Sequence, residues 1–173
     1  MKKIIWNWNM VYYFLCRWEV VTQEVFNYPF LLLLRNKKIK KLYAKRGVKN
    51  PEQIVKNAVG NSKSGANSIP AGIHMGGLLV LLEYSIFNFI QALIGKSLVQ
   101  YFFEDVLSLI LFLALFITPA GIMNYYTLYK KDKYLQYFKE FDKTFKNNKR
   151  KYGWRSFLII ISFYSLIALS FII

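Results

Sequence analysis

The sequence GGLLVLLEYSIFNFIQALIG at residues 76–95, followed after a short turn by VLSLILFLALFITPAGIMNYY at residues 106–126, decides the fold class. The first run contains one formal charge, Glu83, and the second contains none. About 20 residues with a helical rise of about 1.5 Å each match a hydrocarbon core of about 30 Å. We therefore predict a transmembrane helical hairpin within residues 69–129, with a polar turn over Lys96–Asp105.

The composition combines a high apolar content with a large excess of basic residues. Hydrophobic residues make up 55% of the 173 residues, and 24 Lys and Arg stand against 9 Asp and Glu. These properties conflict in a soluble domain but fit a membrane protein, whose spans are apolar and whose loops are basic. We expect an all-α fold: a polytopic α-helical integral membrane protein with three to four transmembrane helices and basic amphipathic cytoplasmic helices.

The charges are distributed so that they predict the topology. Residues 35–68 contain ten Lys and Arg and one acid, and residues 130–151 contain nine and three. Because basic loops stay in the cytoplasm, both blocks are predicted to be cytoplasmic and the hairpin turn to lie outside. Residues 156–173 contain no charge, which predicts a C-terminal transmembrane helix and a C-terminus outside.

Residues 1–34 are open to two interpretations, an aromatic amphipathic helix at the membrane surface or a first transmembrane span. Proline at the Tyr28-Pro29 pair is expected to break or kink the helix. In a span, Arg17 would face the other helices. We favour the span, because the basic residues that follow it would then place the N-terminus outside. One helix face carries an apolar pattern at spacings of four and three, formed by Ile4, Trp8, Val11, Leu15, Trp18, Thr22 and Val25.

The segment 35–68 is predicted to contain two helices and a linker. A basic juxtamembrane helix over Arg35–Arg46 ends at Gly47. A second, short helix starts at Asn50 as its N-cap, with Pro51 in the first helical position and Gln53 reaching back to the cap. It stops by Gly60, and the polar residues 60–68 form a flexible linker.

The segment 130–155 is predicted to be a basic amphipathic helix, with Tyr134, Phe138, Phe141 and Phe145 on one face. That face either lies on the inner leaflet or packs against residues 35–58. Both basic segments are expected to contact anionic lipid headgroups or a partner protein. The residues expected to make these contacts are Lys37, Lys38, Lys40, Lys41, Lys130, Lys131, Lys149, Arg150 and Lys151.

Three polar side chains interrupt the first span of the hairpin. Glu83, Asn88 and Gln91 fall on one stripe of a helix. A carboxylate inside a membrane is costly to bury and is a candidate for function, with Arg17 as its expected partner if the first segment spans. The stripe either lines a pore or pairs helices through structural hydrogen bonds.

A four-residue sequence occurs twice, as Pro70-Ala71-Gly72-Ile73 and Pro119-Ala120-Gly121-Ile122. Proline and glycine free backbone groups that need other partners, so Pro70, Gly72, Pro119 and Gly121 are expected to be helix breaks. The paired breaks would shape a pore mouth or a pocket, or they are ordinary helix punctuation.

The sequence offers little material for catalysis. Cys16 is the single cysteine and His74 the single histidine, which removes catalytic triads, disulfides within the chain, and cysteine or multi-histidine zinc sites. We expect no enzyme, catalytic residue, cofactor or metal. Nucleic-acid binding is not favoured, because the basic residues bracket apolar runs and form no aromatic-studded basic face.

The leading hypothesis is a small non-enzymatic inner-membrane protein, a subunit or scaffold of a membrane complex that acts through helix packing and its basic cytoplasmic elements. A homo-oligomeric channel or membrane-permeabilising effector, for example in antiphage or interbacterial defence, is the first alternative. A membrane immunity protein is the second. The Lys-, Asn- and Ile-rich composition suggests an AT-rich bacterial or phage genome, and therefore a bacterial inner membrane.

Overall fold

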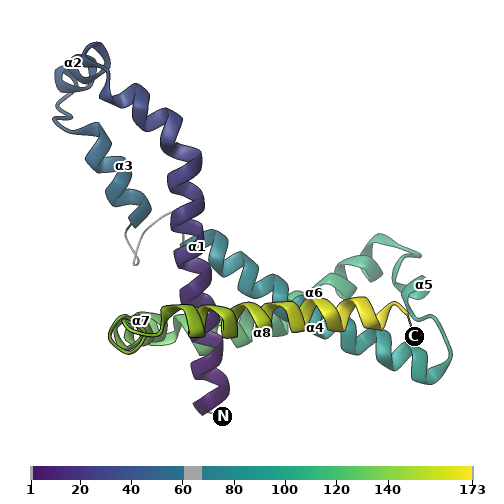
Figure 1. Ribbon diagram of the computed structural model, residues 1–173. Helices are drawn as coiled ribbons and strands as arrows, with labels where there is room; N and C mark the ends of the chain where they lie inside the picture. The colour runs from purple at the N-terminus through teal and green to yellow at the C-terminus, as the bar shows by residue number, and fades with distance from the viewer. Residues whose placement is uncertain (1, 61–67, 173) are drawn as a thin grey trace. The chain divides into compact units, whose positions relative to one another are not determined.

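A computed structural model describes residues 2–60 and 68–172, and every regular element in these ranges is helical (Figure 1). The main helices are α1 (Lys2–Arg35), α2 (Lys37–Lys45), α3 (Pro51–Gly60), α4 (Ser68–Ile94), α5 (Val99–Phe102), α6 (Val106–Asn124), α7 (Lys133–Thr144) and α8 (Lys149–Ser170). Between α6 and α7 lie a π-helical turn, η1 (Tyr125–Tyr129), and a 3₁₀ turn, η2 (Lys130–Asp132).

Three helices in the described part of the chain are long and apolar enough to cross a membrane. They are α4, the helical run Val106–Thr144 that begins with α6, and α8. The prediction of an all-α membrane protein is therefore confirmed. α1, with 34 residues, is longer than α4 and α8, but Arg17, Glu19 and Glu24 interrupt its apolar sequence.

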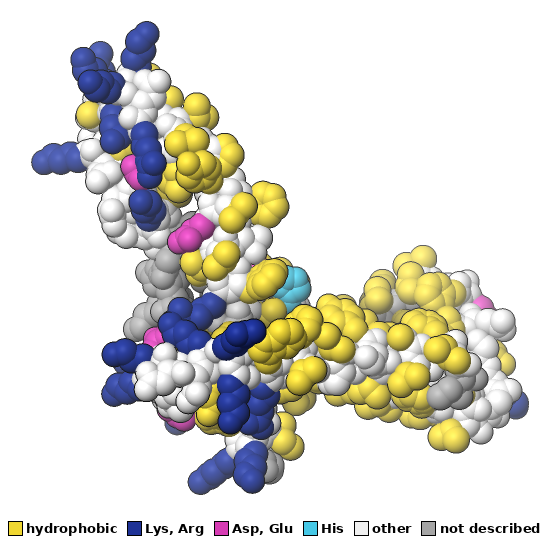
Figure 2. Space-filling view, in the orientation of Figure 1, with side chains coloured by type: hydrophobic (Ala, Val, Ile, Leu, Met, Phe, Trp, Pro, Cys, Tyr) yellow, Lys and Arg dark blue, Asp and Glu magenta, His cyan; other side chains and the backbone are white. Residues whose placement is uncertain are grey.

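The chain forms two compact units, which are described separately. The first, here called the spanning unit, consists of Met1–Tyr13 and Ile73–Ile173, and the second, the arm unit, is Phe14–Gly72. Hydrophobic side chains cover the three long helices of the spanning unit, and Lys and Arg gather around α7 (Figure 2). This separation of apolar helices from basic segments is what the composition predicted.

Aromatic contacts hold the hairpin together inside the spanning unit. The ring of Tyr84 on α4 lies 6.5 Å from that of Phe112 and 5.8 Å from that of Phe116, both on α6. Phe112 and Phe116 are four residues apart and therefore share one face of α6, as does the buried Ala120. The predicted polar turn contains α5, and Gly95 takes the left-handed backbone (φ +68°) that ends α4.

The four residues predicted to break helices do not end one. α4 runs through Pro70 and Gly72, and α6 runs through Pro119 and Gly121 to Asn124. Pro70 lies in the first turn of α4, where backbone N–H groups have no partner within the helix, so its missing donor costs nothing. Pro119 is inside α6 and removes one hydrogen bond from an otherwise continuous helix.

The helical geometry changes further along, after α6. Tyr125–Tyr129 is π-helical, and Lys131 and Asp132 adopt positive φ angles of 58° and 51°. The predicted basic helix is therefore divided: α7 starts at Lys133, and α8 already starts at Lys149. The last membrane helix thus begins inside the basic segment, ahead of the start predicted at Ser156.

In the arm unit, α1 continues through Pro29 to Arg35, so the helix does not break at Tyr28-Pro29, and of the predicted break or kink only the kink stays a prediction. Proline removes one backbone donor, and the leucine-rich residues after it favour the helix strongly enough to continue it. α1 ends where the Asn36 side chain accepts a hydrogen bond from the Lys38 N–H (2.9 Å) and caps α2.

The predicted start of α3 is confirmed. The Asn50 side chain accepts from the Gln53 N–H (3.3 Å), and Pro51 is the first helical residue. The Gln53 side chain points the other way, donating to Asn57 (3.0 Å), so its predicted return to the cap is wrong. Gly47 ends α2 with a φ of +81°, and residues 61–67 of the predicted linker lie outside the described residues.

One ion-pair network joins the end of α1 to α3. Glu52 accepts hydrogen bonds from Arg35 (3.0 Å to Nη2) and forms an ion pair with Lys56 at 3.1 Å. The hydrogen bonds from Arg35 and then Lys56 lower the pKa of the Glu52 carboxyl, and the pairing raises that of Arg35. Glu52, the one acid in the sequence 35–68, thus links the end of α1 to α3.

Candidate functional site: an aromatic anchor and a polar junction

The aromatic face of α7 is the main packing surface at the basic end of the spanning unit. Tyr134, Phe138, Phe141 and Phe145 are all buried. Their partner is the first half of α1: the Tyr13 ring lies 5.1 Å from Phe138 and 5.6 Å from Phe141. The sequence-based prediction for this face named the inner leaflet or residues 35–58 and did not include the first half of α1. We call the cluster of Trp6, Trp8, Tyr12, Tyr13, Phe138, Phe141 and Phe145 the aromatic anchor.

Hydrogen bonds fix the register of α1 on α7. The Trp6 indole donates to Glu140 (3.1 Å), and the Tyr13 hydroxyl donates to Asp142 (2.6 Å). Glu140 and Asp142 are two of the three acids in a segment with nine basic residues. Both acids therefore contribute to the anchor, and the nine basic residues against three acids leave the segment strongly positive.

Asn124, at the end of α6, joins three helices. Its side-chain oxygen accepts from the Trp8 indole (3.1 Å), and it is 6% exposed. A Cβ added to Gly76 of α4 would lie 3.6 Å from the Asn124 amide nitrogen, so α4 passes close by. Asn9 donates to the Thr127 carbonyl (3.1 Å) within η1. A π-helical turn displaces backbone carbonyls from regular pairing and makes such an acceptor available.

Cations lie at the edge of the anchor. The Lys130 ammonium is 4.4 Å from the centre of the Tyr126 ring, and the Arg155 guanidinium is 5.8 Å from that of Trp6. Both are cation–π contacts, which position basic groups beside aromatic rings. Of the residues predicted to contact headgroups or a partner in this unit, Lys131, Lys149, Arg150 and Lys151 are exposed. Lys37, Lys38, Lys40 and Lys41 are exposed on α2 of the arm unit.

The opposite end of the spanning unit carries a second cluster, the polar junction of Asn88, Gln91 and Ser170. Asn88 donates to the Ser170 hydroxyl (3.2 Å) and accepts from Gln91 (3.2 Å). The Gln91 oxygen accepts from the Leu98 and Val99 N–H groups, at 2.6 and 3.1 Å. Two of the three residues of the predicted stripe thus bond within the chain and tie α4, α5 and α8 together.

Glu83 is set apart from the polar junction. Its Oε2 atom is buried, and no hydrogen-bond partner for it is present among the described residues. Arg17 belongs to the arm unit and Glu83 to the spanning unit, so their pairing stays a prediction. The other acids of the hairpin are near its turn, where Asp105 caps α6 by accepting from the Ser108 N–H (2.7 Å). This bond lowers the pKa of Asp105.

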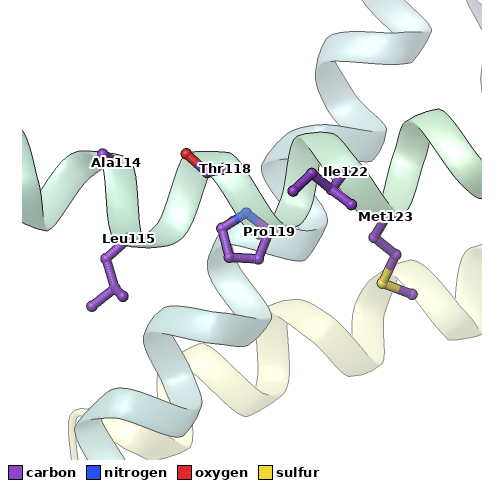
Figure 3. A pocket seen from close by; sticks show the side chains of 6 residues that line it. All are labelled: Ala114, Leu115, Thr118, Pro119, Ile122 and Met123. Carbon is purple, nitrogen blue, oxygen red and sulfur yellow. The ribbon is translucent and has the colours of Figure 1, made fainter.

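An open apolar groove of about 470 Å³ lies beside Pro119 (Figure 3). Its lining residues all come from α6 and are Ala114, Leu115, Thr118, Pro119, Ile122 and Met123. None is titratable, so the groove offers shape and no acid–base chemistry. Pro119 and Ile122 of the second copy of the repeated sequence therefore line an open groove on the surface of α6. Within the described residues no group of three potential metal ligands occurs.

Sequence reasoning identified the aromatic face of α7 and missed that it packs on the first half of α1. The signal was present in the concentration of Trp6, Trp8, Tyr12 and Tyr13 in two turns of α1. Asn9 and Asn124 were missed altogether, because a single amide in an apolar run gives no indication of its partner. Comparison of the chain with known protein families, with characterised proteins and with solved structures finds no match.

Proposed function

We propose that the protein is a non-enzymatic subunit or scaffold of a membrane complex, placed in a bacterial inner membrane with its basic segments in the cytoplasm. The observation that carries the proposal is the anchored α7. Its aromatic face is buried against α1, while Lys139 and Lys143, four residues apart, are exposed. A helix held in this way presents a row of positive charges at a defined position beside the membrane.

The polar junction supports the same proposal. Asn88 and Gln91 use their hydrogen-bonding groups within one chain, as expected of residues that pair helices. The remaining distinctive surfaces are apolar helix faces, which suit lipid or neighbouring spans, and basic helices. A basic helix fits an acidic surface on another subunit or anionic headgroups, through complementary potentials.

The mass of the particle extracted in mild detergent tests the proposal. A complex that contains other chains in a fixed ratio to this 20.5 kDa chain supports a subunit. A symmetric multiple of 20.5 kDa favours self-assembly instead. A bare monomer in detergents that preserve known membrane complexes would contradict both.

Replacing Lys139, Lys143 and Lys146 together by glutamine is expected to reduce recovery of partner chains about tenfold, because exposed ion pairs with an acidic partner surface contribute up to about 1 kcal/mol each. Recovery is measured by quantitative mass spectrometry after purification from the membrane. The matched control replaces the same residues by arginine, which keeps the charge and should retain the partners. Unchanged recovery with glutamine would show that α7 only anchors the chain.

Glu83 favours one alternative, a homo-oligomeric channel, since its buried Oε2 has no partner in the described chain. In an oligomer this carboxylate would face a lumen and attract cations. Glu83→Gln is then expected to lower cation selectivity in planar bilayers several-fold. Ser85→Ala, two residues away on a different side of α4, is the control and should leave conductance as it is. Equal selectivity in the wild type and Glu83→Gln would reject the lumen.

A further inference from the structure

The chain leaves the spanning unit after Tyr13 and returns to it at Ile73, and both points lie at the same end of that unit. At the start, Trp6, Trp8 and Tyr13 of α1 are bonded to Glu140, Asn124 and Asp142. Asn124 is the last residue of α6, and Glu140 and Asp142 lie on α7. All three acceptors are therefore at the basic end of the spans.

The contacts of α4 show at which end the chain returns to the spanning unit. Gly76, near its start, lies beside Asn124, as the 3.6 Å distance from a Cβ built there to the Asn124 amide nitrogen shows. The other end of α4 carries Gln91, which bonds the Leu98 and Val99 N–H groups of the hairpin turn. α4 therefore starts at the basic end and finishes at the turn.

A segment that starts and ends on one side of a bilayer crosses it an even number of times. Within residues 14–67 the remainder of α1, Phe14–Arg35, is long enough to cross once. The return would have to use α2, with 9 residues, or α3, with 10. At about 1.5 Å per residue each reaches about half of a hydrocarbon core of about 30 Å. Residues 61–67 (NSKSGAN) are polar and contain a lysine, so they cannot complete a span.

We propose that residues 14–60 do not cross the membrane and that the second half of α1 lies in the plane of the leaflet at the basic end of the spans. This replaces the fourth span favoured from the sequence. The docking surface is an apolar stripe spaced by three, four, three and four residues. It consists of Trp18, Val21, Val25, Tyr28 and Leu32, which are 71%, 60%, 67%, 57% and 46% exposed.

The occupant of this stripe is the boundary between headgroups and acyl chains of an anionic bilayer. By helical periodicity Glu19 and Gln23 lie on the side of the helix opposite the stripe, so the helix is amphipathic. α2 follows at once with the sequence KKIKKLYAK, which contains five lysines and no acid. Such a cluster next to a membrane-bound helix is attracted to anionic headgroups by about 1 kcal/mol per charge.

Labelling of single cysteines tests the absence of a crossing. In a Cys16→Ser background, Lys41→Cys, Lys143→Cys and Gln100→Cys are exposed to a membrane-impermeant maleimide in sealed vesicles of both orientations. We expect Lys41→Cys and Lys143→Cys to react in the same orientation and Gln100→Cys in the other. Reaction of Lys41→Cys together with Gln100→Cys would overturn the proposal. The result does not depend on whether the protein is a subunit or a pore.

Spin labels at Val25→Cys and Gln23→Cys test the docking surface in vesicles of phosphatidylcholine and phosphatidylglycerol. The ratio of collision rates with oxygen and with a water-soluble nickel complex should be several-fold higher at Val25 than at Gln23, at headgroup depth. Equal ratios, or a Val25 label at the bilayer centre, would refute in-plane docking. Spin–spin broadening at Val25 would instead show that a second copy of the chain covers the stripe.

Discussion

Phe141→Ala is expected to destabilise the spanning unit by about 3–5 kcal/mol, the range for truncating a fully buried aromatic side chain. Phe141 is 0% exposed. Its ring stacks on Phe145 at 4.7 Å and meets the edges of Trp6 at 5.2 Å and Tyr13 at 5.6 Å. Alanine would leave a cavity between α1 and α7 and remove these ring contacts together. Thermal unfolding in mild detergent, followed by circular dichroism, measures the loss.

The matched control for this substitution is Phe26→Ala. Phe26 is 79% exposed on α1, so its truncation should change the free energy of unfolding little. Because Trp6 and Tyr13 of α1 both pack on Phe141, Phe141→Ala should also make the first half of α1 accessible to proteolysis. Equal stability of the two variants would mean that the aromatic anchor does not hold the unit together.

Gln91→Leu is expected to cost about 2–3 kcal/mol, because a single side chain satisfies several groups at the polar junction. Its oxygen accepts from the Leu98 and Val99 N–H groups, and its nitrogen donates to Asn88. Leucine has a similar volume but leaves both N–H groups without an acceptor in a part-buried site. The same unfolding assay measures the loss.

Two further variants separate the causes of this effect. Gln91→Glu keeps an acceptor for both N–H groups and should retain most of the stability, whereas Gln100→Leu, on the exposed surface of α5, should be nearly neutral. If Gln91→Leu were stable but altered ion conductance, the residue would line a lumen and the structural interpretation would fail. Loss of stability without a conductance effect supports the subunit.

The spans could be predicted because they depend on local properties. Hydrophobicity summed over about 20 residues decides whether a helix can enter a bilayer, and neither 76–95 nor 106–126 needs a distant partner for this. The cap at Asn50 is equally local, since its bond reaches three residues along the chain. The proline and glycine residues misled the prediction, because their effect depends on their position within the helix.

The two clusters could not be predicted because their contacts join residues far apart in the chain. Trp8 and Asn124 are separated by 116 residues, and Asn88 and Ser170 by 82. Periodicity shows which face of a helix is apolar or polar, but many faces have the same chemistry, and only the packed chain selects among them.

The sequence alone determined the helical membrane class, the hairpin, the C-terminal span and the basic segments beside them. Each of these depends on the composition of one short stretch. The tertiary structure decided that α7 packs on the first half of α1, that Asn88 and Gln91 bond within the chain, and that α1 begins at the basic end of the spans. These properties depend on geometric fit between distant side chains, which composition does not encode.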